Sequence, residues 1–151
     1  MTLTALTFTA YGNPAPQGSK RHVGNGIMVE SSKALGAWRQ NVVAASLIAT
    51  RGQDWLTPPV AHVHITFLMR RPVNHYRLSK NTIKPNAPTW HVSRPDVDKL
   101  ARAVFDALAT AGVVADDSNI ASLACEKRYV AEGERPGCIV NVWSEESVVA
   151  S

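Results

Sequence analysis

The repeat of apolar residues between positions 97 and 108 constrains the fold more than any other feature of the sequence. These residues recur at intervals of three and four, which places them on one face of an α-helix, and Gly112 is a fitting stop. The members of this face are Val97, Leu100, Ala101, Val104, Phe105 and Leu108. A helix with one apolar face buries it against a second layer, so the sequence predicts a layered fold.

Strands make up the second predicted layer. Residues 60–69 alternate strictly between apolar and polar side chains, which is the pattern of a half-buried strand, and residues 3–11 alternate in the same way. Residues 119–130 and 138–143 are predicted to be a final pair of strands, joined by the turn at 131–137.

A second helix is predicted over residues 32–50, where apolar residues fall near helical spacing and Ser31 or Ser32 is available as the N-cap. The element order is then strand, helix, strand, loop, helix, strand, strand. This order predicts an α/β fold of the α+β type, in which two main helices pack on a small mixed sheet of about four strands. We expect the 151 residues to form one domain, with a frayed tail after about residue 143.

Cysteine and histidine usage argues against a structural zinc site. Cys125 and Cys138 form no CxxC pair, which suits a reducing compartment. His62 and His64 have no matching Cys, His or Glu motif, so we interpret them as the polar face of the strand at 60–69. The chain also lacks an apolar run of about 18 residues and a signal-peptide pattern, so we expect a cytoplasmic protein with no membrane partner.

Charge is distributed unevenly along the chain. Residues 1–95 hold 11 Lys and Arg against 2 acids, whereas residues 96–151 hold 5 against 10. This division suits a polyanion whose phosphates one part neutralises while metal ions occupy the other; a merely basic surface is the alternative. Many of the cations fall in or beside two predicted loops, at 13–26 and 70–93. The candidate phosphate-binding residues are Lys20, Arg21, Arg70, Arg71 and Arg94.

Aspartates flank the helix at both ends, with Asp96 and Asp98 at its start and a pair at 116–117 beyond its end. Ordinary roles explain part of this pattern. The helix macrodipole favours Asp near a helix start, and Ser93 with Asp96 matches a capping box. Asp98 and Arg102 are four residues apart, which predicts a surface ion pair.

Two spacings nevertheless favour a metal cluster. Residues two apart on a helix diverge by about 200°, so Asp96 and Asp98 can share an ion only if Asp96 is the non-helical N-cap. The helix carries the chain about 20 Å away, and residues 113–117, if extended, recover roughly 17 Å. Asp117 can therefore return to Asp98, with the apolar residues 113–115 predicted to be a short buried strand along the helix.

Three carboxylates without Cys or His form a set of hard oxygen ligands, suited to Mg²⁺ or to Mn²⁺ in its place. Such ions activate water for attack on a phosphodiester, with no covalent nucleophile, while Arg102 or a nearby lysine would stabilise the extra charge on the phosphate. The spacing therefore allows Asp96, Asp98 and Asp117 to form a metal-binding cluster, with a chemistry suited to phosphodiester hydrolysis.

The same residues resemble those of the RusA-type Holliday junction resolvases. The resemblance rests on Asp96-x-Asp98-x-Leu100, Arg102, Phe105–Leu108, Gly112, the Asp116-Asp117 pair and the basic segment Pro14–Arg21. It runs from about residue 5 to residue 143. It implies a small dimeric α/β fold and a Mg²⁺-dependent endonuclease that nicks four-way DNA junctions symmetrically. By position, it makes Asp96, Asp98 and Asp117 the catalytic carboxylates that bind metal.

The sequence departs from this family at two cations. Arg102 stands where the family usually has a catalytic lysine, and Lys99 stands where it commonly has asparagine. Because arginine keeps the charge but not the compact ammonium, we expect Arg102 to stabilise charge rather than donate a proton. An exposed pair with Asp98 is the alternative role.

The homodimer that the resemblance implies would present two identical sites to opposing strands. Two other functions stay open. The first is a junction- or duplex-binding protein without catalysis, which the aspartates argue against. The second is a metal-dependent phosphatase for small substrates, which the many basic residues argue against.

Overall fold

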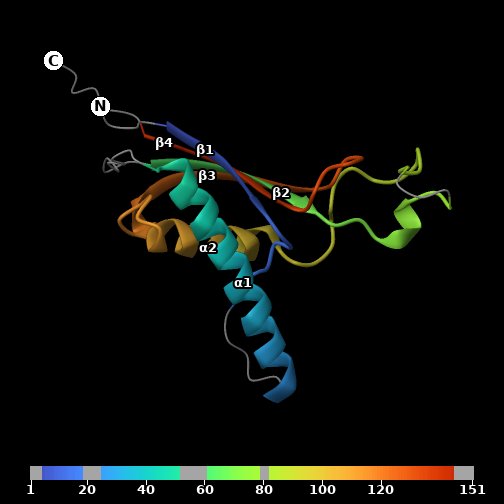
Figure 1. Cartoon of the computed structure of the whole chain (residues 1–151), viewed down its shortest axis with the longest axis horizontal. Helices are drawn as coiled ribbons and strands as arrows, with labels where there is room; N and C mark the ends of the chain where they lie inside the picture. Colours follow the sequence, from blue (N-terminus) through green and yellow to red (C-terminus); the bar gives the residue numbers. More distant parts are fainter. Residues whose placement is uncertain (1–4, 19–24, 52–60, 79–81, 145–151) are drawn as a thin grey trace.

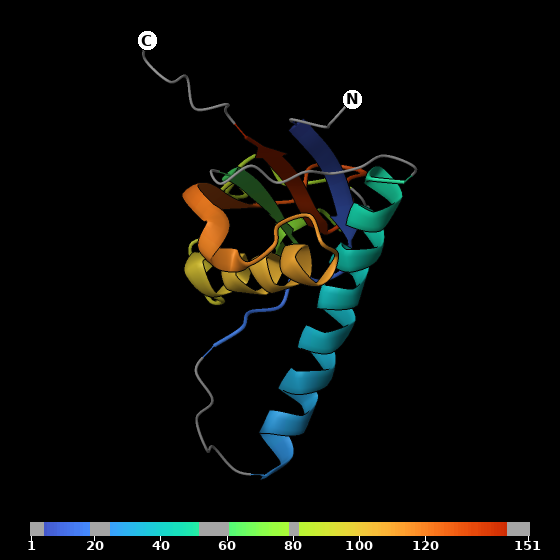
Figure 2. The same cartoon turned by 90° about the vertical axis from the view of Figure 1, so that its left-hand side faces the viewer.

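A four-stranded mixed sheet forms one layer of the protein, and two helices form the other (Figure 1, Figure 2). The computed structural model describes residues 5–18, 25–51, 61–78 and 82–144. Its elements are β1 (Ala5–Tyr11), α1 (Asn25–Ala49), β2 (Ala61–Met69), the 3₁₀ helix η1 (Val73–His75), α2 (Val97–Thr110), the 3₁₀ helix η2 (Asp117–Asn119), β3 (Ile120–Tyr129) and β4 (Gly137–Trp143). The α+β class, with two main helices and a small mixed sheet, is confirmed.

The strands lie in the order β1-β4-β2-β3, with β4 antiparallel to both of its neighbours and β2 parallel to β3. The predicted final pair, β3 and β4, are therefore not neighbours, because β2 lies between them. The connection at residues 130–136 is long enough to cross the roughly 10 Å of two strand spacings. A local sequence pattern finds such strands without revealing which other strand each one pairs with.

The core lies between the sheet and the two helices. The predicted apolar face of α2 is confirmed, since Leu100, Val104 and Leu108 are fully buried, while Val97 and Phe105 pack against the core from its margin. The sheet contributes inward side chains from β1, β2 and β4, and α1 contributes Trp38 and Val42. Each fully buried side chain of this size stabilises the fold by about 1.5–3 kcal/mol, so the position of α2 on the sheet is well determined.

Helix α1 is longer than the sequence pattern predicted. It begins at Asn25 rather than near residue 32, and Ser31 and Ser32 lie inside it instead of capping it. Serine costs only a few tenths of a kcal/mol in a helix interior, so the serine pair does not stop the helix. Figure 2 shows the first half of α1 extending beyond the sheet and α2.

The end of α2 is a Schellman turn. Gly112 has a φ of +77°, its N–H donates to the carbonyl of Ala109, and the N–H of Val113 donates to the carbonyl of Leu108. Residues 113–115 then form bends, so the short strand predicted there is absent. Val113 and Val114 are nevertheless buried, because the turn folds them back against the core.

The other face of the sheet carries no helix in the described residues, and it is largely polar (Figure 1). His64 Nε2 lies 3.5 Å from Glu126 Oε1, and His62 shares a hydrogen bond with Ser122 and stacks on Trp143. This agrees with the polar strand face predicted from the sequence. In the part of the chain that the structure describes, no helix is long and apolar enough to cross a bilayer.

Candidate active site

Asp96 and Asp98 lie at the start of α2, in the arrangement that the sequence predicted. Asp96 is the N-cap, with extended backbone angles of φ −69° and ψ 140°, and Asp98 follows in the first turn. Because the apolar face of α2 is buried in the core, both carboxylates face solvent. The predicted role of Ser93 as the capping residue is wrong, since the helix begins three residues later.

The carboxylate of Asp96 does no capping. An N-cap aspartate usually accepts a hydrogen bond from a backbone N–H of the first turn, but Asp96 makes no such bond. Its Oδ2 instead lies 3.5 Å from Nζ of Lys99, and both side chains remain about half exposed. Asp98 has neither a hydrogen bond nor an ion pair within the described chain. Apart from the contact between Asp96 and Lys99, the described chain gives these two neighbouring carboxylates no hydrogen-bonding partner.

Lys127 on β3 holds the backbone that leads into α2. Its ammonium donates to the carbonyl oxygens of Ser93 and Pro95, the latter at 2.7 Å. The same segment pairs with β3 through its backbone, because the N–H of His91 donates to the carbonyl of Lys127 at 3.2 Å. Sequence reasoning missed Lys127, since a lysine within a strand carries no signal of such a contact.

Asp117 lies on η2, which contacts α2. Its neighbour Asp116 is the N-cap of η2 and accepts hydrogen bonds from the backbone and hydroxyl of Ser118, while the N–H of Asp116 donates to Asn119 Oδ1. The hydrogen bonds from Ser118, side chain before backbone, lower the pKa of the Asp116 carboxyl. Asp116 is thus occupied locally, whereas Asp117 is exposed and has no bonded partner in the described chain.

The three candidate ligands differ in how well the structure brings them together. Among the described residues, no three His, Cys, Asp or Glu side chains lie together in a way that could hold a metal ion. Asp96 and Asp98 share one helix start, and Asp117 is not joined to them in one ligand group. The donor chemistry fits a hard divalent cation, because carboxylate oxygens are the ligands that Mg²⁺ prefers. Coordination by all three would require η2 and the start of α2 to draw closer.

Arg102 is exposed on α2. The ion pair predicted between Arg102 and Asp98 is absent, and no carboxylate of the described chain lies within ion-pair distance of the guanidinium. Its charge is therefore not paired by any acid in the part of the chain that the structure describes.

The segment that leads to the basic residues near position 20 contacts the start of α2, beside the two aspartates. The backbone N–H of Gln17 donates to the carbonyl of Lys99 at 3.0 Å. The Gln17 side chain donates to Asp106 at 2.5 Å and accepts from Arg39 at 3.2 Å, which ties this segment to both helices. The two motifs are far apart in sequence, but they converge in the fold. Lys20 and Arg21 themselves lie outside the described residues.

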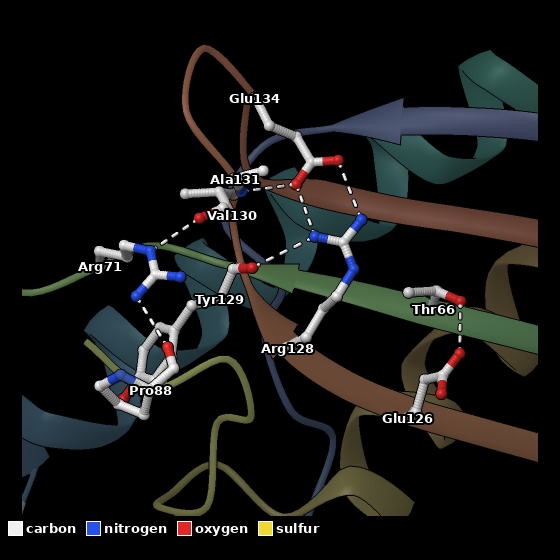
Figure 3. Close-up of polar contacts among 9 residues, drawn as sticks. All are labelled: Thr66, Arg71, Pro88, Glu126, Arg128, Tyr129, Val130, Ala131 and Glu134. Atoms are coloured by element: carbon white, nitrogen blue, oxygen red, sulfur yellow. Dashed lines mark hydrogen bonds and ion pairs between the residues drawn. The ribbon is translucent and has the colours of Figure 1, made fainter. Parts of the chain in front are cut away.

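Arg70 and Arg94 are exposed, as phosphate-binding residues should be, but Arg71 is 9% exposed and is committed inside the protein. Its Nε donates to the carbonyl of Val130 at 2.7 Å and its Nη1 to that of Pro88 at 2.8 Å, with the guanidinium 5.2 Å from the centre of the Tyr129 ring (Figure 3). We therefore correct the prediction that Arg71 contacts phosphate. Its function is to hold the loop that follows β2 against the end of β3.

The site presents exposed carboxylates at a fixed helix start, with the Lys99 ammonium beside them, which is chemistry that metal-assisted hydrolysis of a phosphodiester can use. The family follows from comparison with known proteins. The family model for endodeoxyribonuclease RusA matches residues 12–142, which is most of the chain, and the chain belongs to this family of Holliday junction resolving endonucleases. A search of curated proteins finds no match.

Proposed function

We propose that this endodeoxyribonuclease depends on Mg²⁺, or on Mn²⁺ in its place, and resolves four-way DNA junctions by paired nicks. Asp96, Asp98 and Asp117 would hold the metal. When bound there, a divalent cation supplies an activated water and offsets the charge of the leaving oxygen.

One observation carries this proposal. Asp96 occupies the N-cap of α2, where a capping side chain is worth about 1 kcal/mol, yet its carboxylate leaves the helix N–H groups without that bond. The start of the helix is at the same time fixed by the core and by Lys127. A carboxylate that is held in place and makes no capping hydrogen bond is suited to bind a metal ion.

Different residues of the chain would then bind the metal, stabilise charge and bind the DNA. The start of α2 supplies a fixed pair of carboxylates, and η2 brings Asp117 to them when substrate and metal are present. Lys99 and Arg102 are the cations that follow this pair on α2. The phosphates of the junction arms would be neutralised by the exposed arginines and the basic segment, through Lys20, Arg21, Arg70 and Arg94.

We further propose that the protein acts as a homodimer in the cytoplasm. Paired nicks in opposing strands of a four-way junction need two equivalent sites, and a two-fold dimer supplies them. An inactive junction-binding protein and a metal-dependent phosphatase are the two competing functions.

The test is cleavage of a synthetic four-way junction and of a linear duplex with the same sequence, with Mg²⁺ or with a chelator. We expect paired nicks in the junction only, and only with Mg²⁺. Asp98→Asn is the matched control, because it keeps the shape of the side chain and removes the charged ligand. Binding without cleavage would show an inert binder, equal cutting of both DNAs a general nuclease, and release of phosphate from small esters alone a phosphatase.

A further inference from the structure

Lys99 is the cation that the structure places at the carboxylate pair. Its Nζ lies 3.5 Å from Oδ2 of Asp96. Arg102, one turn further along α2, has no carboxylate of the described chain within ion-pair distance. The two departures from the family pattern, noted in the sequence, therefore differ in geometry.

The position of Lys99 is fixed by more than its own helix. A methyl group built on Gly18 would lie 3.7 Å from Cδ and 3.9 Å from Cε of Lys99, which are ordinary contact distances. The lysine stem thus passes along the backbone of Gly18. Beside it, Gln17 donates its N–H to the Lys99 carbonyl, and the Gln17 side chain is anchored by Asp106. An isolated surface pair on a helix has no such support from a second segment.

We propose that Lys99, rather than Arg102, is the cation that serves the carboxylate centre in this protein. Its ammonium neutralises Asp96 in the free protein and turns to the phosphate of the bound DNA once a metal ion takes up Asp96. This role rests on the proposed function and deepens it. A compact ammonium on a four-carbon stem suits such an exchange of partners, whereas a planar guanidinium suits fixed two-point contacts.

The proposal has two consequences that can be measured separately. Because the ammonium competes with the metal for Asp96, removing its charge should tighten metal binding in the absence of DNA. Because the same charge is needed at the phosphate, its removal should slow cleavage even when metal and DNA are saturating. A residue that only supports the fold would produce neither effect.

The experiment compares Lys99→Met with Arg102→Met. Methionine keeps an unbranched stem that can lie along Gly18, so the packing is preserved while the charge is lost. Lys99→Arg restores a cation, and Lys84→Met is the control for loss of an exposed lysine that lies outside α2. Circular dichroism and thermal melts confirm that each variant is folded. Mg²⁺ alone is titrated by calorimetry, and junction cleavage is followed in single turnovers at saturating Mg²⁺.

For Lys99→Met we expect Mg²⁺ to bind about two- to fivefold more tightly, the size of one surface ion pair, and cleavage to slow on the order of a hundredfold, the size of one lost electrostatic contact. The rate loss should exceed that of Arg102→Met by at least about tenfold. Lys99→Arg should recover only part of it, because a guanidinium restores the charge but not the compact ammonium. Lys84→Met should change neither quantity.

Two results would overturn the inference while leaving the proposed function intact. One is a Lys99→Met variant with the Mg²⁺ affinity and cleavage rate of the wild type. The other is a rate loss in Arg102→Met that equals or exceeds the loss in Lys99→Met. A wild-type protein that does not cleave the junction with Mg²⁺ would overturn both.

Discussion

The start of α2 and the 3₁₀ helix η2 both carry candidate ligands, but they are built in different ways. The α2 start is fixed from behind by buried Leu100 and from the side by Lys127, which reaches from β3 to the carbonyl of Pro95. No residue of η2 is buried, and Asp116 organises it through bonds to residues within three positions. One half of the site therefore depends on the whole fold, and the other half depends on its own short sequence.

If Asp117 joins the other two carboxylates at one metal ion, we expect η2 rather than α2 to adjust. Breaking the core should disturb both halves of the site, whereas breaking the local bonds of η2 should disturb only Asp117. Conservative removal of a ligand should disable either half without affecting the fold.

The largest effect is expected from the carboxylates themselves. Asp96→Asn, Asp98→Asn and Asp117→Asn should each reduce junction cleavage below detection, because each removes one metal ligand while keeping the shape of the side chain. Junction binding should be unchanged or tighter, since negative charge near the phosphates is lost. Gel-shift and cleavage assays on the same samples check this, and any variant that still nicks the junction loses its residue from the ligand set.

Truncation of the core under the α2 start should have the next largest effect. Leu100→Ala should lower the free energy of unfolding by about 2–5 kcal/mol, because Leu100 is fully buried and leaves a cavity. Urea denaturation measures the loss. A cost below about 1 kcal/mol would mean that the start of α2 is not supported by the core as described.

The matching change on η2 should affect activity rather than stability. Asp116→Ala removes the carboxylate that organises η2, so Asp117 should be held less well and cleavage should slow by about 10- to 100-fold. Asp116→Ser can still accept the capping bond and should recover part of the rate. If the melting temperature of Asp116→Ala is far below that of the wild type, η2 is not the independent unit that its contacts indicate.

Acid should weaken the support of the α2 start. Burial lowers the pKa of His91, with the charge of Lys127 adding to the effect, and burial with Arg71 lowers that of His75. The folded state therefore binds fewer protons than the unfolded chain, so stability should fall as the pH drops below about 6.5, the ordinary value for histidine. Denaturation at pH 7.5 and 5.5 checks this. His91→Gln should reduce the difference, and an unchanged difference would assign the effect to other groups.

The smallest effect separates the two neighbouring arginines after β2. Arg70→Ala should lower the slope of log affinity against log salt by about one unit if Arg70 contacts one phosphate. Arg71→Ala should leave that slope unchanged and lower stability instead, because its guanidinium holds Pro88 and Val130. A reduced slope for Arg71→Ala would restore the original prediction for that residue.

The features that were predicted correctly from the sequence are those that a local pattern of residues determines. The 3.6-residue repeat located α2, and the geometry of residues two apart required Asp96 to be the N-cap, as it is. The strand at 60–69 followed from alternation alone. These features depend on neighbours within about one or two turns, which is the range over which a sequence pattern carries information.

The remaining features depend on contacts between distant segments. From the sequence, Arg71 looked like a phosphate-binding residue because it lies in a basic run, but in the fold it lies beside Tyr129. The sequence also gave no indication that Lys127 donates a hydrogen bond to the carbonyl of Pro95. The arithmetic of the return path allowed Asp117 to reach Asp98 without requiring it. Adjacency of β3 and β4 in sequence did not make them neighbours in the sheet.

The position of β4 in the sheet determines when the fold can form during synthesis. β4 is the last strand in the sequence, yet it lies between β1 and β2 and supplies the hydrogen-bonded partner of β1. A nascent chain that ends before Gly137 has β1 without a neighbour and β2 paired on one side only. The sheet can therefore close only after residue 143 has left the ribosome. A chain that ended before Gly137 would lack the strand that joins β1 to β2, so its sheet would be incomplete and it would be a target for proteolysis.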